Sequence, residues 1–79
     1  MDNRIIRCSR TIPTSPHIAK EWYGDDPERT LWTQLRDEFD KEADKIGVTA
    51  WEREPRFRTY DDWRTGATVC EWIGEWKHA

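Results

Sequence analysis

The segment from Asp26 to Gly47 constrains the fold more than any other part of this chain. Asp26 is a favourable N-cap residue, and Pro27 follows at the first helical position, where a missing backbone N–H costs nothing. Apolar residues at three- and four-residue spacing share one helical face: Leu31, Trp32, Leu35, Phe39, Ala43 and Ile46. Gly47 can take the left-handed conformation that ends a helix. The segment therefore predicts a long amphipathic helix that needs a second layer to pack against.

The rest of the chain predicts strands and one short helix. Ser15 can cap this helix, with Pro16 at its first position, Ile18 and Trp22 packing inward, and Gly24 at its end. Strand patterns occupy residues 4–12, 48–53, 56–60 and 67–76, with a break at Glu54-Pro55 and a three-residue hairpin loop at 64–66. Gly66 would take the positive φ of that loop. We expect a single α+β domain over residues 1–79, in the order β-α-α-β-β-β. Its antiparallel sheet has about four strands, the long helix packs on one face, and the first strand lies at an edge or in the middle.

Tryptophan compensates for a core that is poor in aliphatic residues. Charged residues make up 37% of the 79 residues and the apolar class 35%, and six of the residues are tryptophan. An aromatic side chain can remove about 150–250 Å² from water, so a few of them can form a core in place of many aliphatic residues. The formal net charge of −3 argues against indiscriminate binding to nucleic acid or to anionic membranes.

The expected hairpin distributes aromatic residues over both faces of the sheet. Pairing that is symmetrical about residues 64–66 places Trp63 opposite Ala67. One face then carries Phe57, Trp63, Val69 and Ile73, and the other carries Arg58, Tyr60, Cys70, Trp72 and Trp76. The helices can cover only one of these faces. Either long arginine side chains such as Arg56 and Arg58 shield the other face, or it is an interaction surface.

The interaction hypothesis favours Arg58, Tyr60, Trp72 and Trp76 as partner-binding residues, because tryptophan, tyrosine and arginine are enriched at binding hot spots. Gly74 lies between the two tryptophans, and a glycine inside a strand marks a bulge or the close approach of another chain. The expected partner is a protein, either a different one or a second copy of this chain. An acidic stripe on the long helix, formed by Asp37, Asp40 and Asp44, is a secondary candidate surface.

Nucleic-acid binding is the alternative function. Aromatic residues alternate with arginines along the second half of the chain, in the type of pattern that stacks bases and contacts phosphates: Trp51, Arg53, Arg56, Phe57, Arg58, Tyr60, Trp63 and Arg64. Nearby carboxylates such as Glu52 and Glu54 offset these arginines. The protein-binding hypothesis is therefore preferred.

No residue pattern indicates catalysis, a cofactor or a metal site. Cys8, His17, Cys70 and His78 offer metal-binding atoms, but their spacing matches no compact zinc motif. Two distant cysteines with no export signal indicate reduced, buried thiols. No apolar run is long enough to span a membrane. We therefore expect a non-enzymatic cytoplasmic protein.

The whole chain resembles the small accessory proteins encoded by bacteriophages of actinobacterial hosts. The shared features are small size, arginine in preference to lysine, abundant tryptophan and a closing hairpin such as Arg56-Phe57-Arg58-Thr59-Tyr60-Asp61-Asp62-Trp63-Arg64-Thr65-Gly66. The resemblance implies a non-enzymatic protein that binds a host component. It carries over no functional residue.

Overall fold

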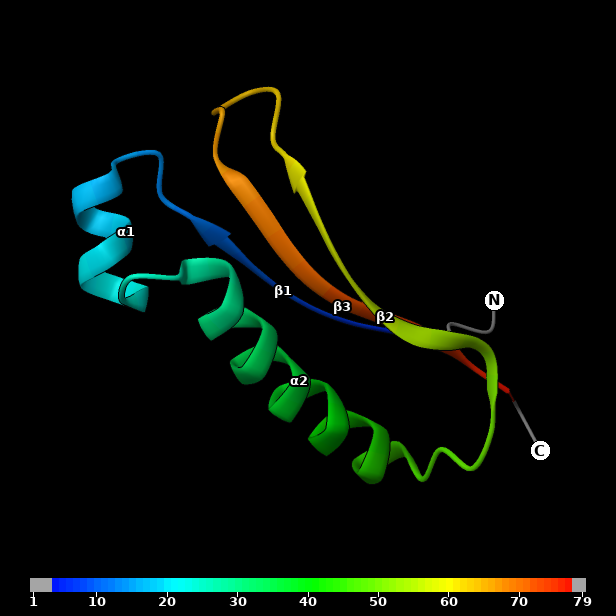
Figure 1. Cartoon of the computed structure of the whole chain (residues 1–79). Helices are drawn as coiled ribbons and strands as arrows, with labels where there is room; N and C mark the ends of the chain where they lie inside the picture. The colour runs from blue at the N-terminus through cyan, green and yellow to red at the C-terminus, as the bar shows by residue number, and fades with distance from the viewer. Residues whose placement is uncertain (1–3, 78–79) are drawn as a thin grey trace.

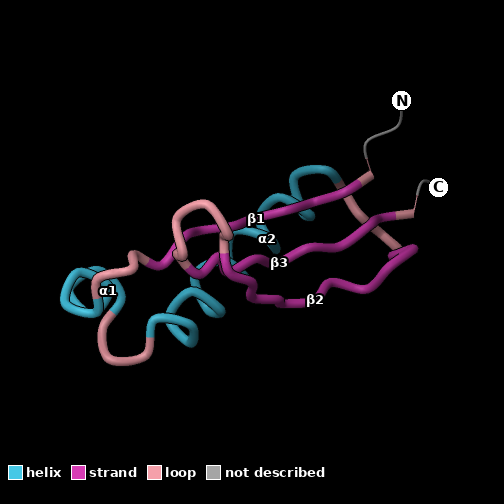
Figure 2. The backbone as a smooth tube through the Cα atoms, turned by 90° about the horizontal axis from the view of Figure 1, so that it is seen from above, coloured by secondary structure: helices cyan, strands magenta, loops and turns pink. Residues whose placement is uncertain are grey.

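The computed structural model describes residues 4–77 and contains three strands and two helices (Figure 1). The elements in chain order are β1 (Ile5–Ile12), α1 (Pro16–Tyr23), α2 (Pro27–Ile46), β2 (Trp51–Asp61) and β3 (Thr68–Trp76). The sheet is antiparallel with the order β1-β3-β2, so β3 is its central strand (Figure 2). The prediction of an α+β fold with an antiparallel sheet is confirmed. The prediction of about four strands is wrong.

The missing fourth strand has merged into β2. The two segments that Glu54-Pro55 was expected to separate form one strand, Trp51–Asp61, whose pairing with β3 shifts register between Trp51 and Arg53 and again between Arg53 and Arg56. A proline lacks the backbone N–H that a ladder needs, and it is tolerated on edge strands and at bulges. β2 is an edge strand with irregular pairing at this point. Pro55 therefore bends the strand without ending it.

The β2–β3 hairpin is one residue out of the expected register. The Asp62 N–H donates to Ala67 O at 2.8 Å, which leaves a four-residue loop at 63–66 instead of three. Gly66 has the expected positive φ, +76°. Phe57 consequently pairs with Trp72, and Tyr60 with Val69. A shift of one residue moves every side chain of a strand to the other face. Phe57 therefore joins the tryptophans on the helix side, whereas the sequence placed it opposite them.

Both helices begin and end where the capping residues predict. The Ser15 Oγ accepts from the Ile18 N–H at 3.4 Å, and the Asp26 Oδ1 accepts from the Arg29 N–H at 3.2 Å. Gly24 and Gly47 follow the last turns of α1 and α2. The packing of α1 differs from expectation, because Trp22 is 62% exposed and Ala19 is the buried residue of this helix.

The core lies between α2 and the sheet. Its buried members are Ile6, Leu31, Leu35, Phe39, Cys70 and Trp72. The Trp72 indole Nε1–H donates to the backbone carbonyl of Trp32 at 2.8 Å, which ties the central strand to the N-terminal part of the helix.

Gly74 allows close packing within this core; the groups that approach it belong to the same chain and not to a partner. A Cβ on Gly74 would lie 2.9 Å from the Trp51 ring, 3.0 Å from the Phe39 ring and 3.2 Å from the Pro55 Cα. The Phe39 and Trp51 rings stack with their centroids 5.5 Å apart. The glycine therefore makes room for this aromatic stack over β3.

The face of the sheet that points away from α2 is covered by a layer of arginine and glutamate. Glu71 lies in the centre of this open face and is only 1% exposed, because two arginines from the neighbouring strands lie over it. Arg58 Nε donates to Glu71 Oε1, and Arg7 Nε lies 3.3 Å from Glu71 Oε2. Arg58 also stacks over the Tyr60 ring, 5.6 Å from its centroid. Shielding by arginine, one of the two interpretations of the second face, describes this side of the sheet.

Candidate functional site: a groove between α2 and β2

Helix α2 does not cover the whole sheet. It lies mainly over β1 and β3 and reaches β2 through side-chain contacts such as the Phe39–Trp51 stack. Figure 2 shows the helix crossing the sheet at an angle to the strands. One helix is about 10–12 Å wide with its side chains, and neighbouring strands lie about 4.8 Å apart, so one helix covers roughly two strands. The helix-facing side of the edge strand β2 is therefore left partly open.

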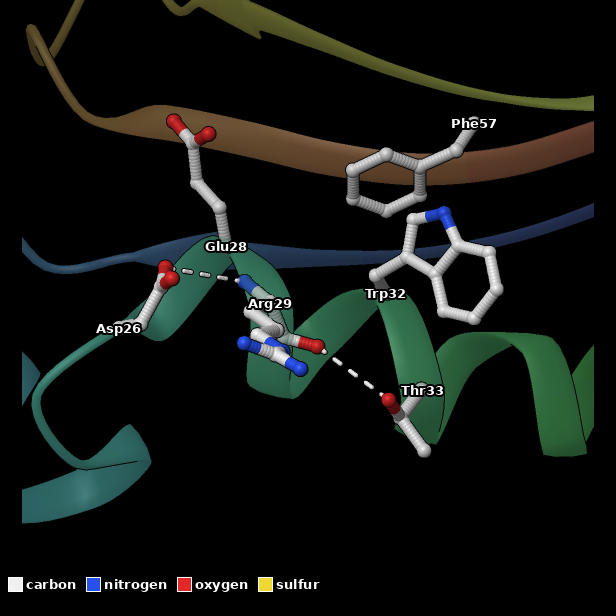
Figure 3. Close-up of a pocket in the computed structure, with 6 residues that line it drawn as sticks. All are labelled: Asp26, Glu28, Arg29, Trp32, Thr33 and Phe57. Atoms are coloured by element: carbon white, nitrogen blue, oxygen red, sulfur yellow. Dashed lines mark hydrogen bonds between the residues drawn. The ribbon is translucent and has the colours of Figure 1, made fainter.

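The first hollow lies at the N-terminal end of α2. It has a volume of about 530 Å³ and is lined by Asp26, Glu28, Arg29, Trp32, Thr33 and Phe57. In Figure 3 the Trp32 and Phe57 rings lie side by side between the helix and the strands, and Glu28 points from the first turn toward the sheet. The Arg29 guanidinium lies beside the first turns of the helix, clear of both rings. Trp32 is 41% exposed, so a large aromatic surface faces this hollow.

A second hollow of about 360 Å³ continues along the same helix. Its lining consists of Arg36, Phe39, Asp40, Trp51, Glu54, Pro55 and Trp72. Trp32 and Trp72 form its boundary with the first hollow, and their ring centroids are 5.2 Å apart. We call the two hollows together the α2–β2 groove. Its walls are the helix and the edge strand, and its aromatic lining runs from Phe57 to Trp51.

One intramolecular cation already sits on the aromatic lining of the groove. The Arg36 guanidinium lies 5.4 Å from the centroid of the Trp32 ring and 5.2 Å from that of Trp72. Its Nε lies 3.8 Å from the Asp40 Oδ2, one turn further along the helix. The guanidinium therefore combines aromatic contact with a carboxylate partner, which is the usual chemistry of a cation–π site.

The groove is acidic overall. Its lining includes four carboxylates, Asp26, Glu28, Asp40 and Glu54, against the two arginines Arg29 and Arg36. The combination is an aromatic floor with a negatively charged rim. Such a surface suits a ligand that has an apolar body and positive charge.

The residues that the sequence proposed as one partner-binding patch lie in different places. Arg58 and Tyr60 lie on the open face, whereas Trp72 lies on the helix side, is 6% exposed and forms part of the groove floor. Trp76 packs at the margin of the core. The expectation that these four residues share a face is wrong, because it depended on the misplaced hairpin register.

The proposed acidic stripe is exposed along α2. Asp37, Asp40 and Asp44 are all accessible to solvent. Asp40 has the ion pair with Arg36 and also lines the groove. Only this member of the stripe therefore contributes to the candidate site.

Sequence reasoning missed the contributions of Trp32 and Glu28, and it placed Phe57 in a possible nucleic-acid surface and not in this groove. The spacing places Trp32 on the apolar face of the helix, and a glutamate at position 28 is explained by the positive end of the helix dipole alone. The available signal was geometric: a single long helix cannot cover three or more strands. An aromatic residue at the edge of its apolar face is then expected to remain accessible.

The two thiols are poor candidates for chemistry. Cys8 is half-buried and Cys70 is fully buried on the helix side of adjacent strands, and both are free. Burial raises the pKa of the Cys70 thiol from 9.0 to about 11, and the Glu28 carboxylate adds to this rise. Burial and the carboxylates of Glu38 and Glu42 likewise raise the pKa of Cys8. The reactive thiolate form is disfavoured at both positions.

Residues 4–77 contain no cluster of three or more histidine, cysteine, aspartate or glutamate side chains that could hold a metal ion. His78, one of the four residues considered for metal binding, lies outside the described residues. Over the same part of the chain, no helix has the length and apolar character needed to cross a membrane. Comparisons with protein families, curated proteins and solved structures return no match, so the site is interpreted from its own geometry.

Proposed function

We propose that this protein is a non-catalytic binding protein that holds a protein partner in the α2–β2 groove. The observation that carries the proposal is the uncovered helix-facing side of β2, where Trp32 and Phe57 line an open hollow next to the core. Large aromatic side chains beside a well-packed core resemble the residues that dominate protein–protein binding energy. The resemblance to bacteriophage accessory proteins supports a host protein as the partner.

The edge position of β2 adds a second way to hold a partner. An edge strand presents backbone donors and acceptors that an extended segment can pair with. The groove runs beside this edge, so a bound segment could place alternate side chains against the aromatic lining. The pairing of β2 with β3 is irregular up to Pro55 and regular from Arg56 onward. A partner segment could therefore pair regularly only with the part of β2 that follows Pro55.

Selection from a random peptide display library tests the proposal. Peptides are selected on the wild-type protein and then measured for binding to Trp32→Leu and to the matched control Trp63→Leu. Trp63 is 86% exposed at the hairpin tip, outside the groove. Its replacement therefore controls for nonspecific binding to an exposed tryptophan and leaves the groove intact. We expect Trp32→Leu to weaken binding about 10-fold or more, as a hot-spot residue does. Circular dichroism verifies that both variants fold.

Two outcomes contradict the proposal. In the first, no peptide is enriched on the wild-type protein. In the second, both variants bind the selected peptides equally well, which places the binding elsewhere. Sedimentation of the wild-type protein alone identifies the case in which the partner is a second copy of the chain.

Nucleic-acid binding keeps one specific observation in its favour. The open face carries four arginines, Arg7, Arg53, Arg56 and Arg58, against the two glutamates Glu71 and Glu75. This basic surface contrasts with the negative charge of the whole chain. The aromatic residues expected to alternate with these arginines are divided, because Trp51 and Phe57 lie on the helix side. Of the other two, Tyr60 lies on the open face and Trp63 is exposed at the hairpin tip.

Fluorescence anisotropy with a labelled oligothymidylate tests this second candidate. Binding through the open face should weaken steeply as salt rises, and Arg56→Gln should reduce the salt dependence. Absence of binding at low salt excludes this function.

A further inference from the structure

We infer that the first hollow of the α2–β2 groove binds a basic side chain of the partner, with arginine favoured over lysine. This inference rests on the proposed function and specifies the partner that the groove selects. The hollow combines the exposed ring of Trp32 and the half-buried ring of Phe57 with carboxylates at its rim, in a volume large enough for one long side chain. Guanidinium groups stack on tryptophan and also pair with carboxylates, so they suit both features.

The rings and the carboxylate lie on opposite sides of this hollow. Trp32 and Phe57 come from the helix and the edge strand and lie together (Figure 3). Glu28 extends toward the sheet from one turn earlier in the helix, so the space lies between its carboxylate and the two rings (Figure 3). An arginine side chain entering this space would lay its methylene stem and guanidinium along the rings. It could then direct its N–H groups at Glu28.

The charge around the hollow favours a cation. The N-terminus of a helix carries a positive partial charge, which by itself repels a guanidinium. Asp26 and Glu28 reverse that effect, since both lie within or beside the first turn. Arg29 also lines the hollow, but in Figure 3 its guanidinium lies beside the helix and does not cover the Trp32 or Phe57 ring.

The protein contains an internal precedent for the proposed contact. Arg36 places its guanidinium over Trp32 and Trp72 and has Asp40 as its carboxylate partner. In the first hollow, Trp32 and Phe57 take the place of that ring pair, and Glu28 takes the place of Asp40. The partner would supply the cation that the chain supplies for itself in the second hollow.

The test uses small amides whose binding is followed by the indole N–H signals of the tryptophans in NMR spectra. N-acetyl-arginine methylamide is compared with the citrulline analogue, which has nearly the same shape and no charge. We expect the arginine compound to shift the Trp32 signal and leave Trp63 little changed. Its affinity should exceed that of the citrulline compound by about two- to fivefold, the range of an exposed cation–π contact. The lysine compound should bind more weakly than arginine.

Two variants, each of which removes one negative charge from α2, distinguish a specific contact in the hollow from a general effect of the helix charge. Glu28→Gln removes a carboxylate that lines the hollow, and Asp37→Asn removes an exposed carboxylate of α2 that lines neither hollow. We expect Glu28→Gln to lower the affinity for the arginine compound about two- to fivefold and Asp37→Asn to leave this affinity unchanged. Glu28 is an exposed residue, so its replacement by glutamine should preserve the fold.

Several results would overturn this inference. They are equal binding of the arginine and citrulline compounds, equal effects of the two variants, or no shift of Trp32 at any concentration of the arginine compound. Its failure can be distinguished from failure of the proposed function by the library selection. Selected peptides that bind the groove but contain no basic residue refute the arginine site and leave the groove as a binding site.

Discussion

Replacing Gly74 by alanine tests how closely the aromatic core is packed on the central strand. With free space around it, alanine would stabilise a strand by about 0.5–1 kcal/mol relative to glycine. The added Cβ would instead lie 2.9 Å from the Trp51 ring and 3.0 Å from the Phe39 ring, where ordinary contacts are 3.4–4 Å. It would also lie 3.2 Å from the Cα of Pro55, a backbone atom that cannot turn aside.

The close contacts should outweigh the gain from alanine. Overpacking a core costs about 1–3 kcal/mol. We therefore expect Gly74→Ala to lower the free energy of unfolding by about 1 kcal/mol net and the Tm by about 4–8 °C, as expected for a domain of this size. Thermal and urea unfolding followed by circular dichroism measure both quantities.

A second substitution identifies the cause of the loss. Trp51→Leu shortens the side chain nearest the added Cβ, so it should be less harmful in the Gly74→Ala background than in the wild type. A coupling energy of at least about 0.5 kcal/mol between the two positions is expected for residues in direct contact. A Gly74→Ala variant as stable as the wild type, or strictly additive effects, would refute the proposed packing.

Three further predictions concern stability. Glu71→Ala should lower the free energy of unfolding by about 1.5–3 kcal/mol, since it removes the carboxylate that both covering arginines contact. Urea unfolding measures this loss. Glu75→Ala should lower the free energy of unfolding less, because Glu75 lies on the same face but is more exposed. Asp26→Ala should cost about 1 kcal/mol through loss of the α2 N-cap, with exposed Asp25→Ala near neutral in the same measurement. The neutral Cys70 thiol, whose pKa is raised from 9.0 to about 11, should stabilise the fold fully below pH 9 and lose this effect as pH rises toward 11. The loss due to Cys70 amounts to about 2–3 kcal/mol. Unfolding at stepped pH should therefore show a steeper loss of stability in the wild type than in Cys70→Ala, in which only the raised pKa of Cys8 still contributes. Equal slopes would contradict the burial argument.

Local sequence rules predicted the helices well, because capping depends on residues adjacent in the chain. Asp26 and Pro27 at the start of α2 and Gly47 at its end have direct structural consequences. The same holds for Ser15 and Gly24 of α1. These features need no knowledge of what packs against the helix.

The sheet was harder to predict because its register depends on one residue in a loop. A three-residue and a four-residue loop are both compatible with Gly66 at positive φ. The difference moves Phe57 and its neighbours to the other face. A proline in a strand pattern can mark either the end of the strand or a bend within an edge strand. Pro55 could be assigned to the second case only once β2 was known to be an edge strand.

The candidate site could not be predicted because it depends on where one layer ends relative to another. Trp32 belongs to the apolar face of α2 by its spacing, and that assignment is correct. Its exposure follows from the position of the helix over β1 and β3, which no local pattern encodes. Phe57 entered the site through the register shift that placed it on the same face of the sheet as Trp72.

The strand order places a constraint on how the chain reaches its native state. β3 forms hydrogen bonds with both other strands, yet it follows both of them in the sequence. β1 therefore has no partner until nearly the whole chain is available, and Ile5 must find Glu75 across the length of the domain. Contacts so distant in sequence slow folding, because the connecting loop must close before they form. We expect the local β2–β3 hairpin to form first, with α2 packing onto it and β1 completing the sheet last. A ribosome-bound chain that lacks β3 would therefore have no sheet for its helices to pack against.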